Sequence, residues 1–204
     1  MRIALFGGTF DPPHLGHLAI ARAAAEAFQL DTVLFAPAGR QPLKLDGSPS
    51  SFTDRLAMTT LACKQDKRFR ASAIDAPRSD GLPNYTADTL ASLRRALPED
   101  TLFNLVGADS FLDLPRWHEP NRLLELAEWI VVSRPGFSLA DFSREDLSSL
   151  HLTPHQQSRV HLLTTVHEDI SATVLRQRLQ AGESCTDALP SAVSTYIHTH
   201  HLYH

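Results

Sequence analysis

The chain has 204 residues, 43% of them hydrophobic, and a formal net charge of −4. This length can bury one substantial core, so we expect a single domain over residues 1–204. The acidic balance, without a basic stripe, argues against nucleic acid as a partner, and no apolar run approaches the length of a membrane span.

The two cysteines, Cys63 and Cys185, lie far apart and show neither metal-binding nor redox spacing. Reduced thiols of this kind are typical of the cytoplasm. The N-terminus leads directly into a strand, without the basic start, apolar stretch and cleavage site of a secretory signal. We therefore expect a cytoplasmic protein.

Short apolar runs that suit buried strands alternate with helical patterns along the chain. The runs cover residues 2 to 6, 32 to 36, 69 to 74, 102 to 106, 129 to 133 and 160 to 164. Such alternation indicates βαβ units, whose right-handed crossovers place helices on both faces of a parallel sheet. We predict an α/β fold with a doubly wound parallel sheet in three layers. Between these elements, residues 41 to 51 are typical of a mobile loop, and residues 137 to 157 of a surface helical insertion.

The first strand ends in a glycine turn that leads into a helix starting near His14. The turn reads Gly7-Gly8-Thr9-Phe10-Asp11-Pro12-Pro13-His14-Leu15-Gly16-His17. A strand, a glycine turn and a helix in this order direct unpaired N–H groups and the positive end of a helix dipole at one point, which suits an anion. His14 and His17 are three residues apart, so both imidazoles lie on one face of the first turn and can donate to a phosphate. Taken alone, an H-x-x-H pair could also be a capping or surface feature, and no nearby ligand set completes a zinc site.

A second helix start occurs near the C-terminus, in Ile170-Ser171-Ala172-Thr173-Val174-Leu175-Arg176. Ser171 is a natural N-cap, and we expect this helix to stop at Gly182. This second helix N-terminus could also hold a phosphate. Thr173 adds a hydroxyl in the first turn, and the guanidinium of Arg176 can bind the same phosphate with two hydrogen bonds. Without the first motif, the segment could equally be an ordinary capped amphipathic helix.

The middle of the chain places polar groups after a buried strand. Asn84-Tyr85-Thr86 begins a helix, and the strand that ends at Gly107 is followed at once by Asp109 and then by Trp117-His118. Residues just past the carboxyl end of a parallel strand line the ligand crevice. The Trp117 side chain could either pack in the hydrophobic core or contact a ligand.

The two end motifs resemble the G-x-F-D-x-x-H-x-G-H and I-S-x-T-x-x-R signatures of the nucleotidylyltransferase superfamily. The resemblance implies a Rossmann-like fold and transfer of a nucleoside monophosphate from a triphosphate to a phosphate acceptor. The middle blocks resemble the bacterial nicotinate mononucleotide adenylyltransferases, which also carry an R-P-G after a late strand, here Arg134-Pro135-Gly136. This likeness covers essentially the whole chain. It implies transfer of AMP from ATP to nicotinate mononucleotide, with release of pyrophosphate.

The resemblance also implies which residues act. Catalysis would depend on His14, His17 and Arg176. The residues expected to bind ATP are Gly7, Gly8, Thr9, Phe10, Gly16, Lys44, Ile170, Ser171 and Thr173. The residues expected to bind nicotinate mononucleotide are Tyr85, Thr86, Gly107, Asp109, Trp117, His118 and Arg134. Mg²⁺ would be held by ATP rather than by the protein.

The chain departs from the family at two positions. The family commonly has Pro-Pro-His-Lys after its second strand, whereas this chain has Leu43 before Lys44. It also commonly has an aromatic residue where this chain has His118. Two alternatives stay open: a phosphopantetheine adenylyltransferase, usually a shorter chain, and a non-catalytic nucleotide sensor, which should have lost part of the motifs. A class I aminoacyl-tRNA synthetase shares an H-x-G-H element but would need a much longer chain and a lysine-rich second motif, and this sequence has neither.

Overall fold

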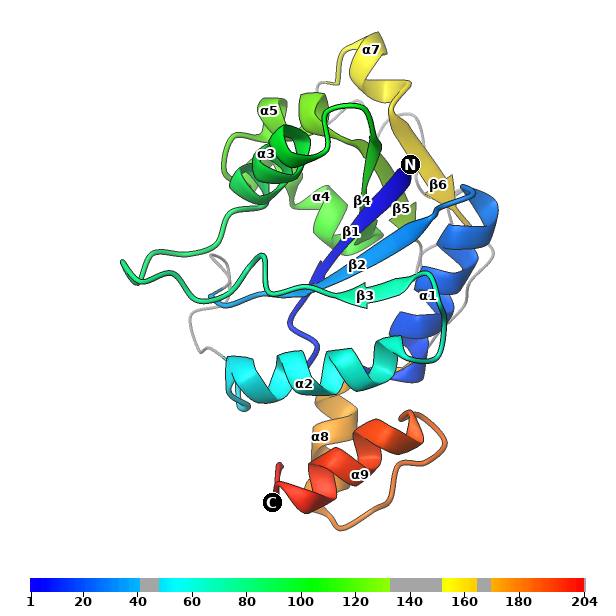
Figure 1. Ribbon diagram of the computed structural model, residues 1–204, viewed down its shortest axis with the longest axis vertical. Helices are drawn as coiled ribbons and strands as arrows, with labels where there is room; N and C mark the ends of the chain where they lie inside the picture. Colours follow the sequence, from blue (N-terminus) through cyan, green and yellow to red (C-terminus); the bar gives the residue numbers. More distant parts are fainter. Residues whose placement is uncertain (41–47, 133–151, 165–169, 204) are drawn as a thin grey trace.

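The computed structural model describes residues 1–40, 48–132, 152–164 and 170–203 (Figure 1). Within these residues, six strands form one sheet in the order β3-β2-β1-β4-β5-β6, and each neighbouring pair is parallel. The strands are β1 (Arg2–Gly8), β2 (Thr32–Pro37), β3 (Phe69–Ala71), β4 (Thr101–Gly107), β5 (Glu128–Val132) and β6 (Val160–Leu163). The predicted doubly wound parallel sheet is confirmed.

The helices connect the strands and flank the sheet. They are α1 (Leu15–Ala27), α2 (Phe52–Cys63), α3 (Thr86–Ala96), α4 (Ala108–Leu112), the 3-10 turn η1 (Leu114–Arg116), α5 (Pro120–Leu126), α7 (Pro154–Gln157), α8 (Ala172–Gln180) and α9 (Ser191–Thr199). Most of the predicted insertion at 137 to 157 and of the predicted loop at 41 to 51 lies outside the described residues.

The side chains of the strands alternate between two cores. Ala4 and Phe6 join the core on the first face, whereas Ile3 and Leu5 join the core on the second. The first face is covered by α1, α2, α8 and α9, and the second by α3, α4 and α5. Figure 1 shows α2, α8 and α9 below the sheet and α3 and α5 above it, which gives the three predicted layers.

One strand is shorter than predicted. The apolar run at 69 to 74 forms a strand only over Phe69–Ala71. The hydroxyl of Ser72 accepts a hydrogen bond from the N–H of Ile74 at 3.3 Å. A local side-chain turn of this kind competes with the ladder and ends the edge strand.

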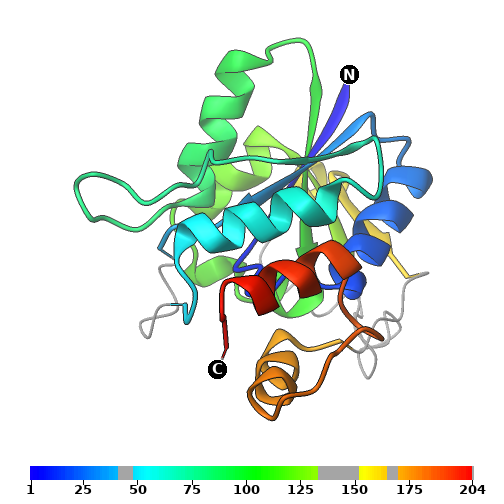
Figure 2. The same ribbon diagram turned by 60° about the horizontal axis from the view of Figure 1, so that its bottom comes forward.

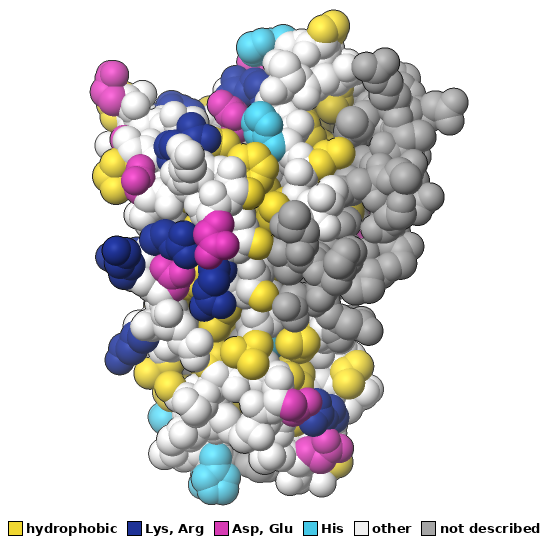
Figure 3. Space-filling model, turned by 90° about the vertical axis from the view of Figure 1, so that its right-hand side faces the viewer, with side chains coloured by type: hydrophobic (Ala, Val, Ile, Leu, Met, Phe, Trp, Pro, Cys, Tyr) yellow, Lys and Arg dark blue, Asp and Glu magenta, His cyan; other side chains and the backbone are white. Residues whose placement is uncertain are grey.

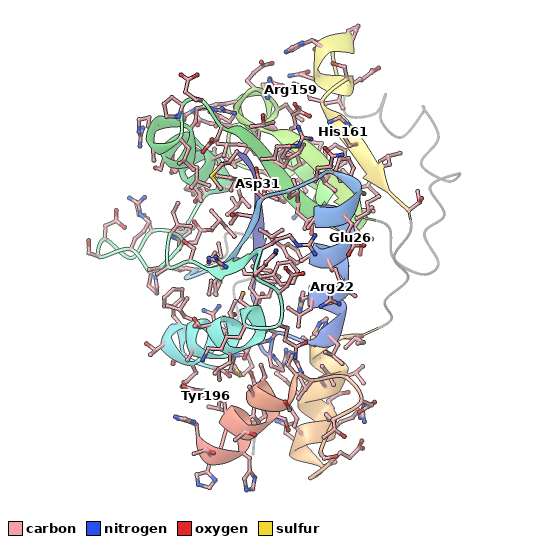
Figure 4. All side chains as sticks on the ribbon, turned by 45° about the vertical axis from the view of Figure 1, so that its right-hand side comes forward. Arg22, Glu26, Asp31, Arg159, His161 and Tyr196 are labelled. Carbon is pink, nitrogen blue, oxygen red and sulfur yellow. The ribbon has the colours of Figure 1, made fainter. Side chains whose placement is uncertain are left out.

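The surface mixes charges of both signs on the face in Figure 3. Arg22 and Glu26 extend from the outer side of α1 (Figure 4), where Arg22 lies 3.8 Å from Asp66 and Glu26 lies 3.9 Å from Arg68. Both cysteines are free and buried. In the described part of the chain, no helix is both long and apolar enough to span a bilayer.

Candidate active site

The two motif histidines stack on one another at the start of α1. His14 is the N-cap residue, with an extended backbone, and its N–H donates to Nδ1 of His17 at 3.2 Å. The ring centroids are 3.6 Å apart with an interplanar angle of 28°. Because Nδ1 of His17 accepts a hydrogen bond, the proton of the neutral ring is on Nε2. The predicted helix start is confirmed, and the two prolines directly precede the cap. We call His14 and His17 the histidine pair.

Aromatic side chains pack against the histidine pair. The ring of Phe10 lies 4.9 Å from that of His17 and 5.5 Å from that of Phe6. Phe10 is only 2% exposed, so its side chain belongs to the core. At this position, ATP would contact the backbone rather than the side chain. Its φ of 50° lies in the left-handed region, which is costly for a residue with a Cβ and persists only where the surroundings hold it.

Residues 9–13, which we call the Asp11 turn, are fixed by side chains that the motif did not reveal. The guanidinium of Arg55, on α2, donates to the carbonyl of Thr9 at 2.8 Å. The Asp11 carboxylate accepts hydrogen bonds from the hydroxyls of Ser48 and Tyr203 and from the N–H of Ser50. Burial alone would raise the pKa of Asp11, but these donors outweigh it and lower the pKa. The carboxylate is therefore held in its charged form.

One of these missed residues left a signal in the sequence. Arg55 shares a helical face with Met58, Thr59 and Ala62, all of them buried, so a helical projection would have placed a cation on the core side of α2. Tyr203 left no such signal, because it meets Asp11 across 192 positions of the chain.

The second motif meets the first at the Asp11 turn. Nη1 of Arg176 donates to the carbonyl of Asp11 at 2.9 Å, and Nη2 donates to the hydroxyl of Thr173 at 3.3 Å. Ser171 occupies the predicted N-cap position, but its side chain makes no capping hydrogen bond and the residue is exposed. Gly182 follows the helix end with a φ of 82°, as predicted for the stop.

The strands that flank the topological switch point end in glycines. β1 and β4 are neighbours in the sheet, and the connection that reaches β4 crosses to the other side of β1. A Cβ added to Gly7 or to Gly107 would meet no atom within 4 Å. Open space above the carboxyl ends of these two strands is where ligands bind in doubly wound folds. Gly8 differs, because its Cβ would touch the ring of Phe10 at 3.0 Å.

Four of the described residues expected to bind the acceptor, Tyr85, Thr86, Asp109 and Trp117, lie on or beside elements of the second face. Tyr85, the N-cap of α3, stacks on His118 with centroids 4.2 Å apart and an interplanar angle of 29°. Thr86 is the first residue of α3, and Asp109 is exposed in the first turn of α4. Trp117 is partly buried against the core, with its ring 6.1 Å from that of Trp129. Its packing role is thus observed, and its ligand role stays a prediction.

Two predicted contacts, Lys44 and Arg134, lie outside the described residues. Gly16 is buried in the first turn of α1, and Ile170 packs against the core of the first face. The described residues of the two motifs, which we predict to bind phosphate, therefore lie on the first face, and most of the described residues predicted to bind the acceptor lie on the second. The two sets approach the same end of the sheet, where β1 and β4 end.

This fold and this grouping of donors define a doubly wound α/β protein of the nucleotidyltransferase class. Residues 5–178 match the model of the cytidylyltransferase-like family. A protein of Thermus thermophilus, named probable nicotinate-nucleotide adenylyltransferase, is 41% identical over 203 residues, with 100% of both chains covered. A protein of the same name from a Roseiflexus species is 43% identical over 202 residues, covering 98% of this chain and 97% of the relative. The chain belongs to the cytidylyltransferase-like family and, within it, to the nicotinate-nucleotide adenylyltransferases.

Solved structures agree on the fold. Plasmodium falciparum nicotinic acid mononucleotide adenylyltransferase complexed with NaAD superimposes with a TM-score of 0.78, covering 99% of this chain and 97% of that one. A second structure of that protein, complexed with APC, gives a TM-score of 0.76. At 19% identity, these likenesses concern the fold alone. The predicted family and its Rossmann-like fold are confirmed.

Proposed function

We propose that the protein transfers AMP from ATP to nicotinate mononucleotide, giving nicotinate adenine dinucleotide and pyrophosphate, a step of NAD biosynthesis. The observation that carries this proposal is the convergence of the histidine pair and Arg176 on the Asp11 turn, beside two glycine-ended strands. The names of its relatives support the choice of acceptor. We further propose that residues 1–204 act as one nucleotidylyltransferase domain, and that the protein works in the cytoplasm.

ATP is held on the first face. The Nε2–H of His17 donates to its phosphate oxygens, while Arg176 adds a guanidinium from α8. The N–H of Leu15, the first residue of α1, already donates to the carbonyl of Ala188 at 2.9 Å, so the side chains supply these donors. The glycine turn and the second motif line the same phosphates. The residues that we assign to ATP are Gly7, Gly8, Thr9, Phe10, Gly16, Lys44, Ile170, Ser171 and Thr173. The magnesium ion belongs to the substrate, where phosphate oxygens and water coordinate it.

Nicotinate mononucleotide is held on the second face. The Thr86 hydroxyl and the backbone at Trp117 and His118 receive the nicotinate carboxylate, and an aromatic ring stacks on the pyridine. Asp109 meets a polar edge of the nucleotide. The remaining residues that we assign to the acceptor are Tyr85, Gly107 and Arg134.

The transfer is a direct in-line displacement at phosphorus. An oxygen of the acceptor's 5′-phosphate attacks the α-phosphorus of ATP, a new P–O bond forms, and the bond to the bridging oxygen breaks to release pyrophosphate. No protein nucleophile takes part. The rate arises from holding two anions together and from N–H donors aimed at the charge that develops on the α-phosphate and the leaving group. His14, His17 and Arg176 supply those donors.

An acceptor panel tests the proposal. The purified protein is incubated with Mg-ATP and, separately, with nicotinate mononucleotide, nicotinamide mononucleotide and phosphopantetheine, and pyrophosphate release is measured. We expect the highest kcat/KM with nicotinate mononucleotide. A preference for phosphopantetheine would move the protein to coenzyme A synthesis, and ATP binding without release of pyrophosphate for any acceptor would indicate a sensor.

A further inference from the structure

The C-terminal end of the chain reaches the Asp11 turn. Tyr203 follows α9, is only 9% exposed, and donates its hydroxyl hydrogen to the carboxylate of Asp11. Figure 2 shows the C-terminus near the C-terminal end of α9, on the side of the sheet that α2 and α8 also cover. The last described residue of the chain is thus bonded to a residue of the first motif.

The protonation states at this contact are fixed. Burial, and then the hydrogen bond to Asp11, raise the pKa of the Tyr203 phenol, so it remains a donor near neutrality. The pKa of Asp11 is lowered, because the donors around it outweigh the effect of burial. The contact therefore joins a neutral hydroxyl to a carboxylate, and such charge-assisted hydrogen bonds are about twice as strong as neutral ones.

Asp11 transmits this contact to the histidine pair. Its carbonyl accepts from Arg176, so one residue is held through its backbone by the second motif and through its side chain by Tyr203. Only Pro12 and Pro13 separate it from His14, and proline fixes φ, so a displacement of Asp11 passes to the helix start. On the other side, Phe10 has a φ of 50° that its surroundings must maintain.

We propose that the Tyr203 hydroxyl, acting through Asp11, is a positioning group that holds the histidine pair at the triphosphate. This inference rests on the function proposed above. Tyr203 would contribute no atom to the reaction. It would set the location of donors that must lie at the correct distance from developing charge.

The chain offers a matched control for this test. Tyr196, which lies within α9, donates its hydroxyl hydrogen to Asp54 of α2 at 3.0 Å, between α9 and α2 (Figure 4). Tyr203→Phe and Tyr196→Phe therefore remove the same atom, each time from a C-terminal tyrosine bonded to an aspartate. Only the first of these aspartates lies in the turn before the histidine pair.

The measurement is steady-state release of pyrophosphate by the full chain, with ATP and nicotinate mononucleotide varied separately, beside thermal unfolding of each variant. We expect Tyr203→Phe to lower kcat by about 10- to 100-fold, since an error of about 1 Å in placement can cost 10²-fold. The KM for nicotinate mononucleotide should stay within about twofold of wild type. Tyr196→Phe should keep wild-type kcat while its melting temperature falls by a similar few degrees.

A second variant tests the route through Asp11. Ser48→Ala removes another donor to the same carboxylate and should lower kcat in the same direction as Tyr203→Phe. If Tyr203→Phe loses only thermal stability, or loses no more kcat than Tyr196→Phe, the inference is wrong. If the wild-type protein itself releases no pyrophosphate with nicotinate mononucleotide, the proposed function fails first, and the two failures are distinguishable.

Discussion

Gly107→Ala tests whether the open space above β4 is ligand space. Gly107 has a φ of −72° and a ψ of 153°, a conformation that any residue adopts, and its added Cβ would meet no atom within 4 Å. The fold alone therefore gives no reason for a glycine at this position. A substrate that approaches the backbone closely would give one.

The expected changes in stability and in binding have opposite signs. A strain-free glycine-to-alanine change stabilises a fold by roughly 0.4–1 kcal/mol through the unfolded state. For a chain of this size, that raises the melting temperature by about 1–4 °C. A methyl group forced against a closely packed ligand costs about 1–3 kcal/mol. Since about 1.4 kcal/mol is a factor of ten, kcat/KM should fall roughly 5- to 150-fold.

The assay pairs thermal unfolding with kcat/KM for each substrate, and Gly182→Ala is the control. Gly182 has a φ of 82° just beyond α8, so alanine there should lower the melting temperature, because a Cβ is strained in that region. At a temperature where this variant is folded, its kcat/KM should equal that of the wild type. A Gly107→Ala protein with wild-type kcat/KM for both substrates would refute the reasoning.

Three further outcomes are expected. His17→Ala should lower kcat by about 10² or more with little change in melting temperature, since it removes a donor to the developing charge, and an unchanged kcat would exclude that role. Thr86→Val should raise the KM for nicotinate mononucleotide by about 10- to 150-fold and leave that for ATP unchanged, because a hydrogen bond to a charged group contributes about 1.5–3 kcal/mol. A KM for nicotinate mononucleotide equal to that of the wild type would remove the hydroxyl from the acceptor site. The hydrogen bond from Arg68 lowers the pKa of Asp66 to about 2 from 3.8, so its stabilising contribution is present above about pH 4 and is lost as the pH falls toward 2. Between about pH 4 and pH 2, the free energy of unfolding of Asp66→Asn should therefore vary less with pH than that of the wild type. The same pH dependence in both proteins would contradict this assignment.

The parts of the fold that depend on local sequence could be predicted from it. The run ending at Phe6 is apolar because β1 is buried between two layers. α1 starts directly after the glycine turn and the two prolines, with His14 as its N-cap and Leu15 as its first helical residue. The spacing of His14 and His17 was enough to place both rings on one face. The stacking at 3.6 Å follows from that spacing together with the hydrogen bond between them.

The support of the site could not be predicted in the same way. Ser48, Tyr203 and Arg176 form hydrogen bonds with Asp11 from three distant segments of the chain. No local sequence pattern predicts which aspartate they bind. The motif shows that position 11 is acidic, but its role depends on tertiary structure. The sequence does not distinguish an aspartate on the surface from a buried aspartate whose carboxylate accepts three hydrogen bonds.

In the proposed reaction, the division of the motifs between the two faces explains why the transfer would need no nucleophile from the protein. The residues that we propose for the triphosphate lie at the starts of α1 and α8, those that we propose for the acceptor lie at the starts of α3 and α4, and the sheet separates these two sets of helices. In this proposal the two ligands meet above the ends of β1 and β4, where a Cβ added to Gly7 or Gly107 would meet no atom within 4 Å. A site that brings two phosphates together there, and supplies N–H donors from one side, already gives the proximity and charge stabilisation that transfer at phosphorus requires.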